Sequence, residues 1–194
     1  MGEKREYVGF RLKQRKEPDS VNFFVFAACP GDIIRWSCVN RQEDRLRGRE
    51  RRLSPARQRA ITKFFTDDDV NTIPTCVVLA FKPESASFAS FPGESFGKTG
   101  IGTEYLPSGS FEWGILSFEF DPHQPETERP SFVVDGQHRL FGMSEVEHDE
   151  IPVLVSALID AEPNEQAFQF IVINNKVRRV PSDVVHSLIA DFNE

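Results

Sequence analysis

Apolar and polar positions alternate along the chain in a way that predicts strands and helices in turn. Runs rich in β-branched and aromatic residues have the length and composition of buried strands, whereas segments with apolar residues three or four apart are typical of helices. Proline opens two of the strands, where no ladder donor is needed, and it follows Ser54 at the start of one helix. The predicted strands cover residues 21–28, 33–39, 73–81, 115–120, 132–135 and 151–159, and the predicted helices begin at residues 54, 138, 162 and 181.

This order of elements predicts the fold class. Strands and helices alternate from residue 54 onward, which favours an α/β fold with a small mixed sheet and flanking helices. Residues 83–114 are rich in Ser, Gly, Pro and Phe and lack a helical period, so we expect an insertion at about 83–130 that forms a hairpin or a long loop. The charged residues 1–20 predict an edge strand or a partly ordered arm around Tyr7 and Phe10.

Length and composition place further bounds on the protein. A chain of 194 residues predicts a single domain, and 18 Phe against two Tyr and two Trp predict a Phe-rich core. The N-terminus lacks a signal-peptide pattern and no apolar run has membrane length, so we expect a cytoplasmic protein without a membrane partner. Cys29, Cys38 and Cys76 do not have zinc-site spacing, which favours free thiols. The last predicted helix reaches the final residue without a C-cap signal, which is typical of a piece of a longer protein.

One stretch is strongly basic although the net charge is −7. Residues 41–59 contain eight arginines against three acidic residues. Arginine without lysine favours bidentate contacts with phosphate or carboxylate groups. Three interpretations remain open: contact with nucleic acid, a second wall of a nucleotide site, or a solvated surface that balances acidic runs elsewhere. The residues that we nominate as nucleic-acid or phosphate contacts are Arg49, Arg51, Arg52 and Arg57.

The chain is organised around residues 132–143. Three apolar residues predict a short strand, Asp135 and Gly136 predict a turn, and the apolar positions that follow predict a helix. Gln137, His138 and Arg139 would then lie on its first turn, where backbone N–H groups and the helix dipole attract anions. The alternative is that Asp135 caps the helix and Arg139 forms an ordinary surface ion pair.

The run Asp-Gly-Gln-His-Arg at residues 135–139 resembles the signature of the DGQHR-domain proteins. This family includes DndB-type regulators of DNA phosphorothioation and ParB-like partners of DNA-modification systems, and it looks like a branch of the ParB/sulfiredoxin fold. A second patch, residues 170–176 followed by Val180 and Pro181, resembles the family's Phe-x-x-Ile-Asn element. The resemblance covers roughly residues 30–190 and implies a ParB/sulfiredoxin-like domain.

The resemblance also implies a ligand and a set of site residues. It implies ATP or CTP with Mg²⁺, with the phosphates bound at Gly136, Gln137, His138 and Arg139. The nucleophilic cysteine of sulfiredoxin aligns with Gln137, so we do not expect reductase chemistry. Triphosphate hydrolysis would then involve Asp135, Gln137 and His138, with Asp135 either holding Mg²⁺ or capping the turn. The second patch nominates Asn174, Asn175 and Lys176 as further phosphate partners, although such a sequence is also an ordinary turn.

Three functions remain open at this point. The first is a nucleotide-binding ParB-like module, with or without slow ATPase or CTPase activity, in a DNA-modification or restriction system that serves phage defence. The second is a DndB-like DNA-binding transcriptional regulator without catalysis, and the third is a scaffold whose signature is purely structural. The expected partners are a nucleoside triphosphate and either DNA or a DNA-modification enzyme, and a homo-oligomer is compatible with each function.

Overall fold

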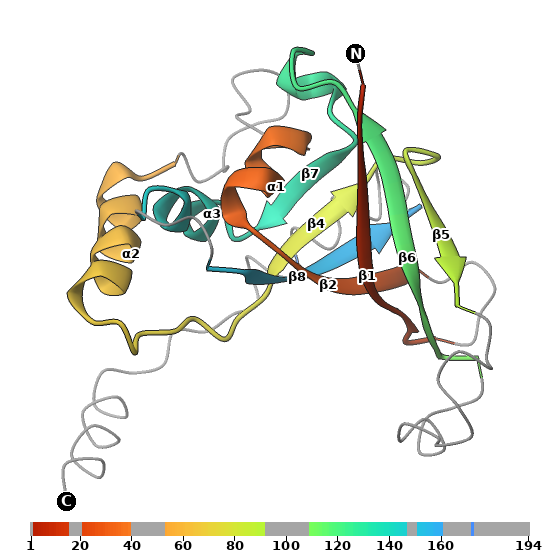
Figure 1. Ribbon diagram of the computed structural model, residues 1–194, viewed down its shortest axis with the longest axis horizontal. Helices are drawn as coiled ribbons and strands as arrows, with labels where there is room; N and C mark the ends of the chain where they lie inside the picture. The colour runs from red at the N-terminus through yellow and green to blue at the C-terminus, as the bar shows by residue number, and fades with distance from the viewer. Residues whose placement is uncertain are drawn as a thin grey trace, which may run out of the picture.

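A curled mixed sheet carries the helices of the described chain (Figure 1). The computed structural model describes residues 2–15, 21–39, 53–91, 109–146, 151–160 and 172. The strands are β1 (Glu3–Lys13), β2 (Asn22–Ala28), β3 (Ser37–Cys38), β4 (Val77–Phe81), β5 (Ala86–Ser90), β6 (Phe111–Phe120), β7 (Ser131–Asp135) and β8 (Val153–Ile159). The helices are α1 (Pro30–Trp36), α2 (Pro55–Asp67) and α3 (Gln137–Ser144), with a 3₁₀ turn η3 (Glu126–Glu128). The predicted α/β class with a mixed sheet is confirmed.

The strands are ordered β3-β7-β4-β8-β2-β1-β6-β5. β3 pairs with β7 and β4 with β8 in parallel, whereas the other neighbours are antiparallel. Consequently β2, β3 and β7 run toward the sheet end at which β4 and β8 begin. Val78 pairs with Asp135 and Ala28 pairs with Val153, so this end contains the turn between β7 and α3 and the start of α1.

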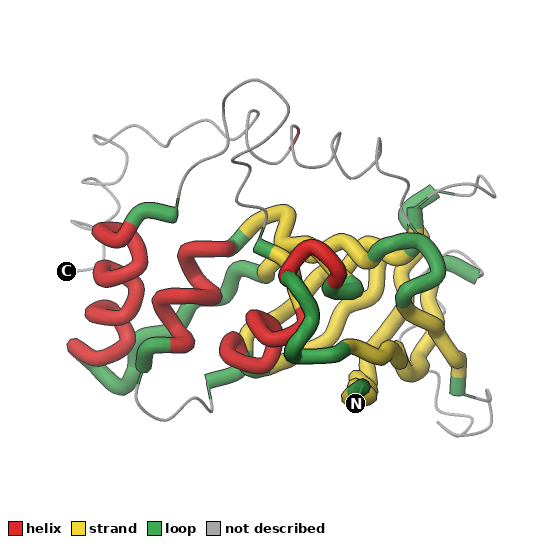
Figure 2. The backbone as a smooth tube through the Cα atoms, turned by 90° about the horizontal axis from the view of Figure 1, so that it is seen from above, coloured by secondary structure: helices red, strands yellow, loops and turns green. Residues whose placement is uncertain are grey.

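The core lies between one face of the sheet and the helices. Figure 2 shows α2 and α3 side by side at one end of the molecule, while the strands extend toward the other end. The prediction of a Phe-rich core is confirmed, because Phe24 and Phe81 are fully buried and Phe26, Phe118 and Phe120 almost so. The helices contribute five buried side chains to this core, from Ile33, Trp36, Phe65, Leu140 and Met143.

Local sequence explains where α2 begins and how it packs. Ser54 is the N-cap, its hydroxyl oxygen accepts from the amide of Arg57 at 3.5 Å, and Pro55 occupies the first turn, as predicted. The helix lies against α3 at Gly142. A Cβ built on Gly142 would lie 2.7 Å from Cβ of Ile61, so the two backbones come closer than any residue with a side chain would allow.

The predicted strand at residues 33–39 is wrong. This segment is helical to Trp36, and only Ser37 and Cys38 form a strand. Pro30 supplies the first helical position, and Ile33 and Trp36 are fully buried on the same side of the helix. A spacing of three residues between these two large side chains suits a helix, whereas the unbroken apolar run had suggested a strand.

β1 is not an edge strand, contrary to the sequence-based expectation. It lies between β2 and β6, and its pairing with β6 extends from Glu3 opposite Phe120 to Leu12 opposite Phe111. Charged residues on the strand had favoured an edge. The structure accommodates them in ion pairs such as Arg5 with Asp32 and Arg11 with Glu112.

A polar cluster fixes α1 to β1. The carboxylate of Asp32 accepts from Nη2 of Arg5 at 3.0 Å and from the hydroxyl of Tyr7 at 2.6 Å. Burial works against the charge on Asp32, but the hydrogen bonds from Arg5 and Tyr7 outweigh it and lower the pKa of the carboxyl group. Burial and the neighbouring carboxylate raise the pKa of Tyr7 well above its ordinary value. The cluster is therefore most stable with Asp32 ionised and Tyr7 protonated.

Within residues 83–130, β5 and β6 form an antiparallel pair, as expected of the predicted hairpin. Residues 92–108, which connect these strands, lie outside the described residues, as do the predicted helices at 162–173 and 181–192. In the part of the chain that the structure describes, no helix combines the length and the apolar character needed to cross a membrane.

Candidate functional site

The signature turn has the predicted geometry. β7 ends at Asp135, Gly136 follows with φ 97° and ψ 9°, and α3 begins at Gln137. The amide of Leu140 donates to the carbonyl oxygen of Gly136 at 3.0 Å and closes the first helical turn. The prediction of strand, turn and helix over residues 132–143 is confirmed.

Two independent constraints require glycine at position 136. Its φ lies in the left-handed region that residues with a side chain rarely adopt. An added Cβ would also lie 3.1 Å from Cγ2 of Val77 and 3.2 Å from Nη2 of Arg139. The turn is therefore packed against the start of β4 and against its own arginine.

Arg139 joins the chain just before β4 to the side chain of Asp135. Its Nη1 atom donates to the carbonyl oxygens of Thr75 at 2.9 Å and Cys76 at 2.8 Å, and to the Thr75 hydroxyl at 2.6 Å. Its Nη2 atom donates to Asp135 at 2.8 Å, and only 18% of the side chain is exposed. Arg139 thus holds the chain just before β4 against the turn. The sequence had suggested a surface cation directed at a phosphate, and this positioning role was not foreseen.

Asp135 pairs with Arg139 and does not cap α3. The N-cap residue is Gly136, which has no side chain, and the Asp135 carboxylate accepts from Arg139 across one helical turn. The prediction that Asp135 caps the helix is therefore wrong. The ion pair expected for Arg139 is present, but the arginine side chain is mostly buried rather than on the surface.

The resemblance placed Mg²⁺ at Asp135, which makes the carboxylates and other metal ligands near this residue relevant. Among the described residues, no three His, Cys, Asp or Glu side chains gather as a metal site would require. One carboxylate already paired with a guanidinium does not make a protein-only magnesium site. Mg²⁺ at this place would have to be held chiefly by nucleotide phosphates, as is common for this ion.

His138 accepts a hydrogen bond rather than donating one at Nε2. The backbone amide of Ser54 donates to this atom at 2.9 Å. A ring nitrogen that accepts carries no proton, so His138 in this contact is a neutral imidazole with its proton on Nδ1. In this arrangement His138 therefore adds no positive charge to the first turn of α3.

The same contact brings the described end of the arginine-rich stretch to the signature turn. Residues 53–59 belong to that stretch, and Ser54 touches the second residue of α3. Arg57, nominated as a phosphate contact, lies exposed on the first turn of α2. The other nominated arginines, Arg49, Arg51 and Arg52, lie outside the described residues, as do Asn174, Asn175 and Lys176.

Sequence reasoning missed the groups that position the turn. These are the amide of Ser54 and the carbonyl oxygens of Thr75 and Cys76. Ser54 was identified as a helix cap, but its second contact joins residues 84 apart and leaves no local signal. Backbone carbonyl oxygens carry no sequence signature at all.

Comparison of the chain with protein-family models, with curated proteins and with solved structures found no match. The residues of this chain must therefore carry any functional proposal by themselves.

Proposed function

We propose that the chain is a nucleotide-binding ParB-like module of a DNA-modification or restriction system, and that it binds the phosphates of a nucleoside triphosphate at the start of α3. The observation that carries the proposal is the hydrogen bond from Ser54 to His138 at 2.9 Å. It brings together the described end of the strongest basic stretch in the sequence and a glycine turn that opens a helix.

The turn has several properties that suit a phosphate. Gly136 supplies the left-handed turn that opens α3, and the positive end of the α3 dipole lies beside it. Arg139 is a positioning residue in this scheme, since it fixes the turn to the chain before β4. The cationic side of the site comes from Arg49, Arg51 and Arg52, whose positions just before Ser54 in the sequence support this assignment.

Nucleotide binding is tested by thermal melts at low salt with ATP, CTP, GTP and UTP, each with and without Mg²⁺. A ligand at one hundred times its Kd stabilises the folded protein by about 2.7 kcal/mol, which is a readily measured shift. We expect one nucleotide to raise the melting temperature, and slow phosphate release would then identify hydrolysis. Unchanged melting with all four would overturn the proposal.

A matched pair of triple variants locates the binding site. Replacing Arg49, Arg51 and Arg52 by alanine should weaken nucleotide binding by roughly ten-fold or more for each arginine that bonds to a phosphate. Replacing Arg57, Arg59 and Lys63 removes the same charge from the exposed side of α2 and should leave nucleotide affinity nearly unchanged. Equal losses in both variants would indicate a general electrostatic effect rather than a site.

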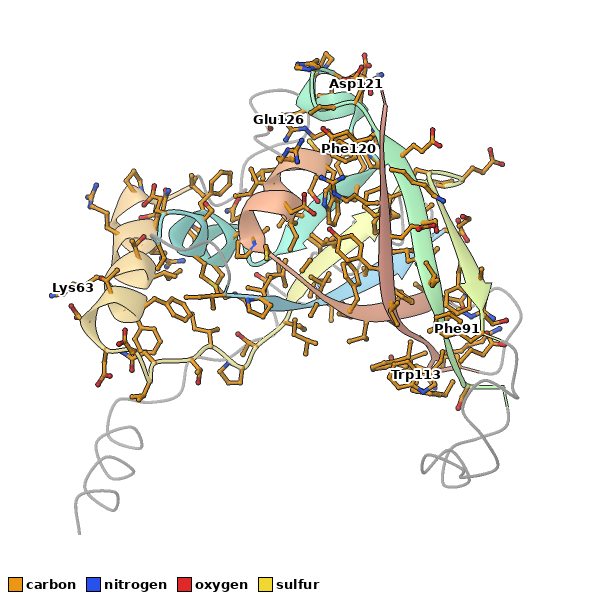
Figure 3. The ribbon with its side chains drawn as sticks, viewed as in Figure 1. Lys63, Phe91, Trp113, Phe120, Asp121 and Glu126 are labelled. Atoms are coloured by element: carbon orange, nitrogen blue, oxygen red, sulfur yellow. The ribbon has the colours of Figure 1, made fainter. Side chains whose placement is uncertain are left out.

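The second candidate is a DndB-like DNA-binding regulator without catalysis. Its support is a set of exposed cations on α2, namely Arg57, Arg59 and Lys63. Figure 3 shows Lys63 on the outer side of α2, away from the sheet. Exposed cations of this kind can contact the phosphates of a nucleic-acid backbone.

The same two variants separate the candidates. If DNA is the ligand, duplex DNA should bind the parent protein with strong salt dependence, and the Arg57, Arg59 and Lys63 variant should flatten that dependence. A parent protein that binds a nucleotide but not DNA excludes the regulator. The reverse result excludes the nucleotide module.

A further inference from the structure

The core side of the sheet becomes polar at the end away from the signature turn. Phe24 lies opposite Arg11 in the pairing of β2 with β1, and it is fully buried in the core. Because directly opposite residues of paired strands point to the same face, Arg11 points to the core side as well. β2 begins at Asn22 and runs toward the signature turn, so Asn22 lies at the other end of the sheet. Figure 3 shows Trp113 of β6 at this other end, far from Lys63 on α2.

Strand register brings five polar side chains together on this side of the sheet. Arg11 and Lys13 are two residues apart on β1, so their side chains share a face. Glu112 lies opposite Arg11 on β6, and Asn22 lies opposite Lys13 on β2. Ser110 precedes Glu112 by two residues, and its carbonyl oxygen accepts from the amide of Lys13 at 2.8 Å. Three neighbouring strands therefore supply one polar surface.

These five side chains line a hollow, which we call the Arg11 pocket. Together with Gly109 they surround a volume of about 250 Å³. Pockets for drug-sized ligands measure roughly 300–1,000 Å³, so the Arg11 pocket suits a smaller molecule. Gly109 leaves its side of the pocket open, because a Cβ added there would meet nothing within 4 Å.

Arg11 is held in position and keeps donors for a ligand. Its Cζ atom lies 4.6 Å from the centre of the Phe88 ring, so a cation–π contact supports the guanidinium. Among the described residues, the guanidinium donates to Glu112 alone. A guanidinium has five N–H donors, so one ion pair does not occupy them all. A planar group held in this way is well suited to a carboxylate ligand.

We propose that the Arg11 pocket binds a small hydroxycarboxylate. Its two cations and one carboxylate leave a single positive charge, which a monoanion balances. A phosphate group, with about −1.5 to −2 charges at pH 7, would exceed it. Arg11 and Lys13 bind the carboxylate of the ligand. The Asn22 amide and the Ser110 hydroxyl can each donate and accept, which suits the hydroxyl of the ligand. The pocket is separate from the signature turn, so this inference does not rest on the proposed function.

NMR titration of the full chain with L-lactate and propionate tests the proposal, because these two monoanions differ only in the hydroxyl. At constant ionic strength, about 10 mM ligand detects a Kd near 1 mM. We expect lactate to shift the backbone amides of residues 11–13, 22 and 109–112, and propionate to bind several-fold more weakly. Amides at residues 136–139 report separately on anions at the signature turn. Absence of shifts around Arg11 with lactate would overturn the proposal, as would equal or tighter binding of propionate or inorganic phosphate in the pocket.

A matched pair of carboxylate variants tests the charge of the pocket. Glu112 and Glu3 both pair with an arginine and are 37% and 34% exposed. Glu112→Gln removes the carboxylate that competes for Arg11 and should tighten lactate binding by roughly five-fold, whereas Glu3→Gln should leave it unchanged. Arg11→Ala should weaken binding by about ten-fold or more, and Asn22→Asp, which changes little besides charge, should weaken it as well. Equal lactate affinity in the two glutamine variants, or unchanged affinity in the Asn22→Asp variant, would overturn the proposal.

Discussion

The backbone amide of Ser54 donates to Nε2 of His138, so the residue that caps α2 is fixed to the first turn of α3. A second bond, from the hydroxyl of Thr62 to the carbonyl oxygen of Gly142 at 2.8 Å, joins the same two helices further along. The position of the signature turn is therefore coupled to the position of α2. A ligand that displaced the His138 ring would be expected to move the start of α2 as well.

Replacing Arg139 by alanine should destabilise the unliganded protein. The change removes donors from the carbonyl oxygens of Thr75 and Cys76 and leaves Asp135 without its cation. We expect a loss of about 2–3 kcal/mol in the free energy of unfolding, measured with urea. Arg139→Lys should recover part of it, since one ammonium group cannot reach all the acceptors that the planar guanidinium reaches. Arg57→Ala, at an exposed position, is the control, and an equal loss there would contradict the positioning role.

Gly136→Ala should destabilise the protein through both backbone strain and steric contact. A comparison with Gly109 separates these two effects. Gly109 also has a positive φ, 75°, but a Cβ added there would meet nothing within 4 Å. Gly109→Ala should therefore cost only the backbone strain, about 1–2 kcal/mol. Gly136→Ala should cost more, because its Cβ would press on Val77 and Arg139. Chemical denaturation of both variants gives the difference, and equal costs would show that the turn relaxes around the new side chain.

Gly142→Ala should reverse the usual effect of alanine in a helix. Alanine at an exposed interior helical position is more stable than glycine by roughly 1 kcal/mol. At position 142, however, the added Cβ would lie 2.8 Å from the carbonyl oxygen of Gln58 and 2.7 Å from Ile61. We expect a net loss of stability and a weaker contact between α2 and α3, seen as faster amide exchange at the start of α2. A variant more stable than the parent protein would show that the helices separate without penalty.

The cluster of Asp32, Tyr7 and Arg5 should limit stability at both ends of the pH scale. Asp32 has a lowered pKa in the folded state, so the unfolded chain binds its proton first and stability falls as the pH drops below about 4. Tyr7 has a raised pKa, so the unfolded chain loses its proton first and stability falls as the pH rises above about 10.

Two substitutions test the two limbs of that pH profile. Asp32→Asn should flatten the acid limb, and Tyr7→Phe should flatten the alkaline limb. Free energies of unfolding measured across the pH range would reveal both changes. Parallel profiles for parent and variants would mean that other groups govern the pH dependence.

Local features of the fold were predictable from sequence, and features that depend on distant contacts were not. The turn at Gly136 and the cap at Ser54 follow from short-range preferences of glycine, serine and proline, and the structure confirms both. The run from Ile33 to Val39 was ambiguous, since short apolar runs suit a strand or a buried helix equally well. Its helix is decided by packing, because Trp36 stacks on Phe81 from β4.

In the candidate site, too, local features were predictable from sequence and distant contacts were not. The order of strand, glycine and helix could be derived from residues 132–143, but the partners of Arg139 and His138 could not. Arg139 bonds to residues more than sixty positions away, and His138 to one 84 positions away. The sequence therefore predicted the backbone of the turn, whereas the distant protein groups that Arg139 and His138 contact left no signal in it.

The central place of β1 has a consequence for how the chain folds during synthesis. Glu3 pairs with Phe120, so β1 completes its pairing with β6 only after residue 120 has been synthesised. Until then β1 can form a hairpin with β2, through pairs such as Phe10 with Val25, and its other edge stays open. An open strand edge is a template for another chain. Expression yield should therefore respond to translation speed and chaperones, and a substitution on the β6-facing edge of β1 should affect yield more than final stability.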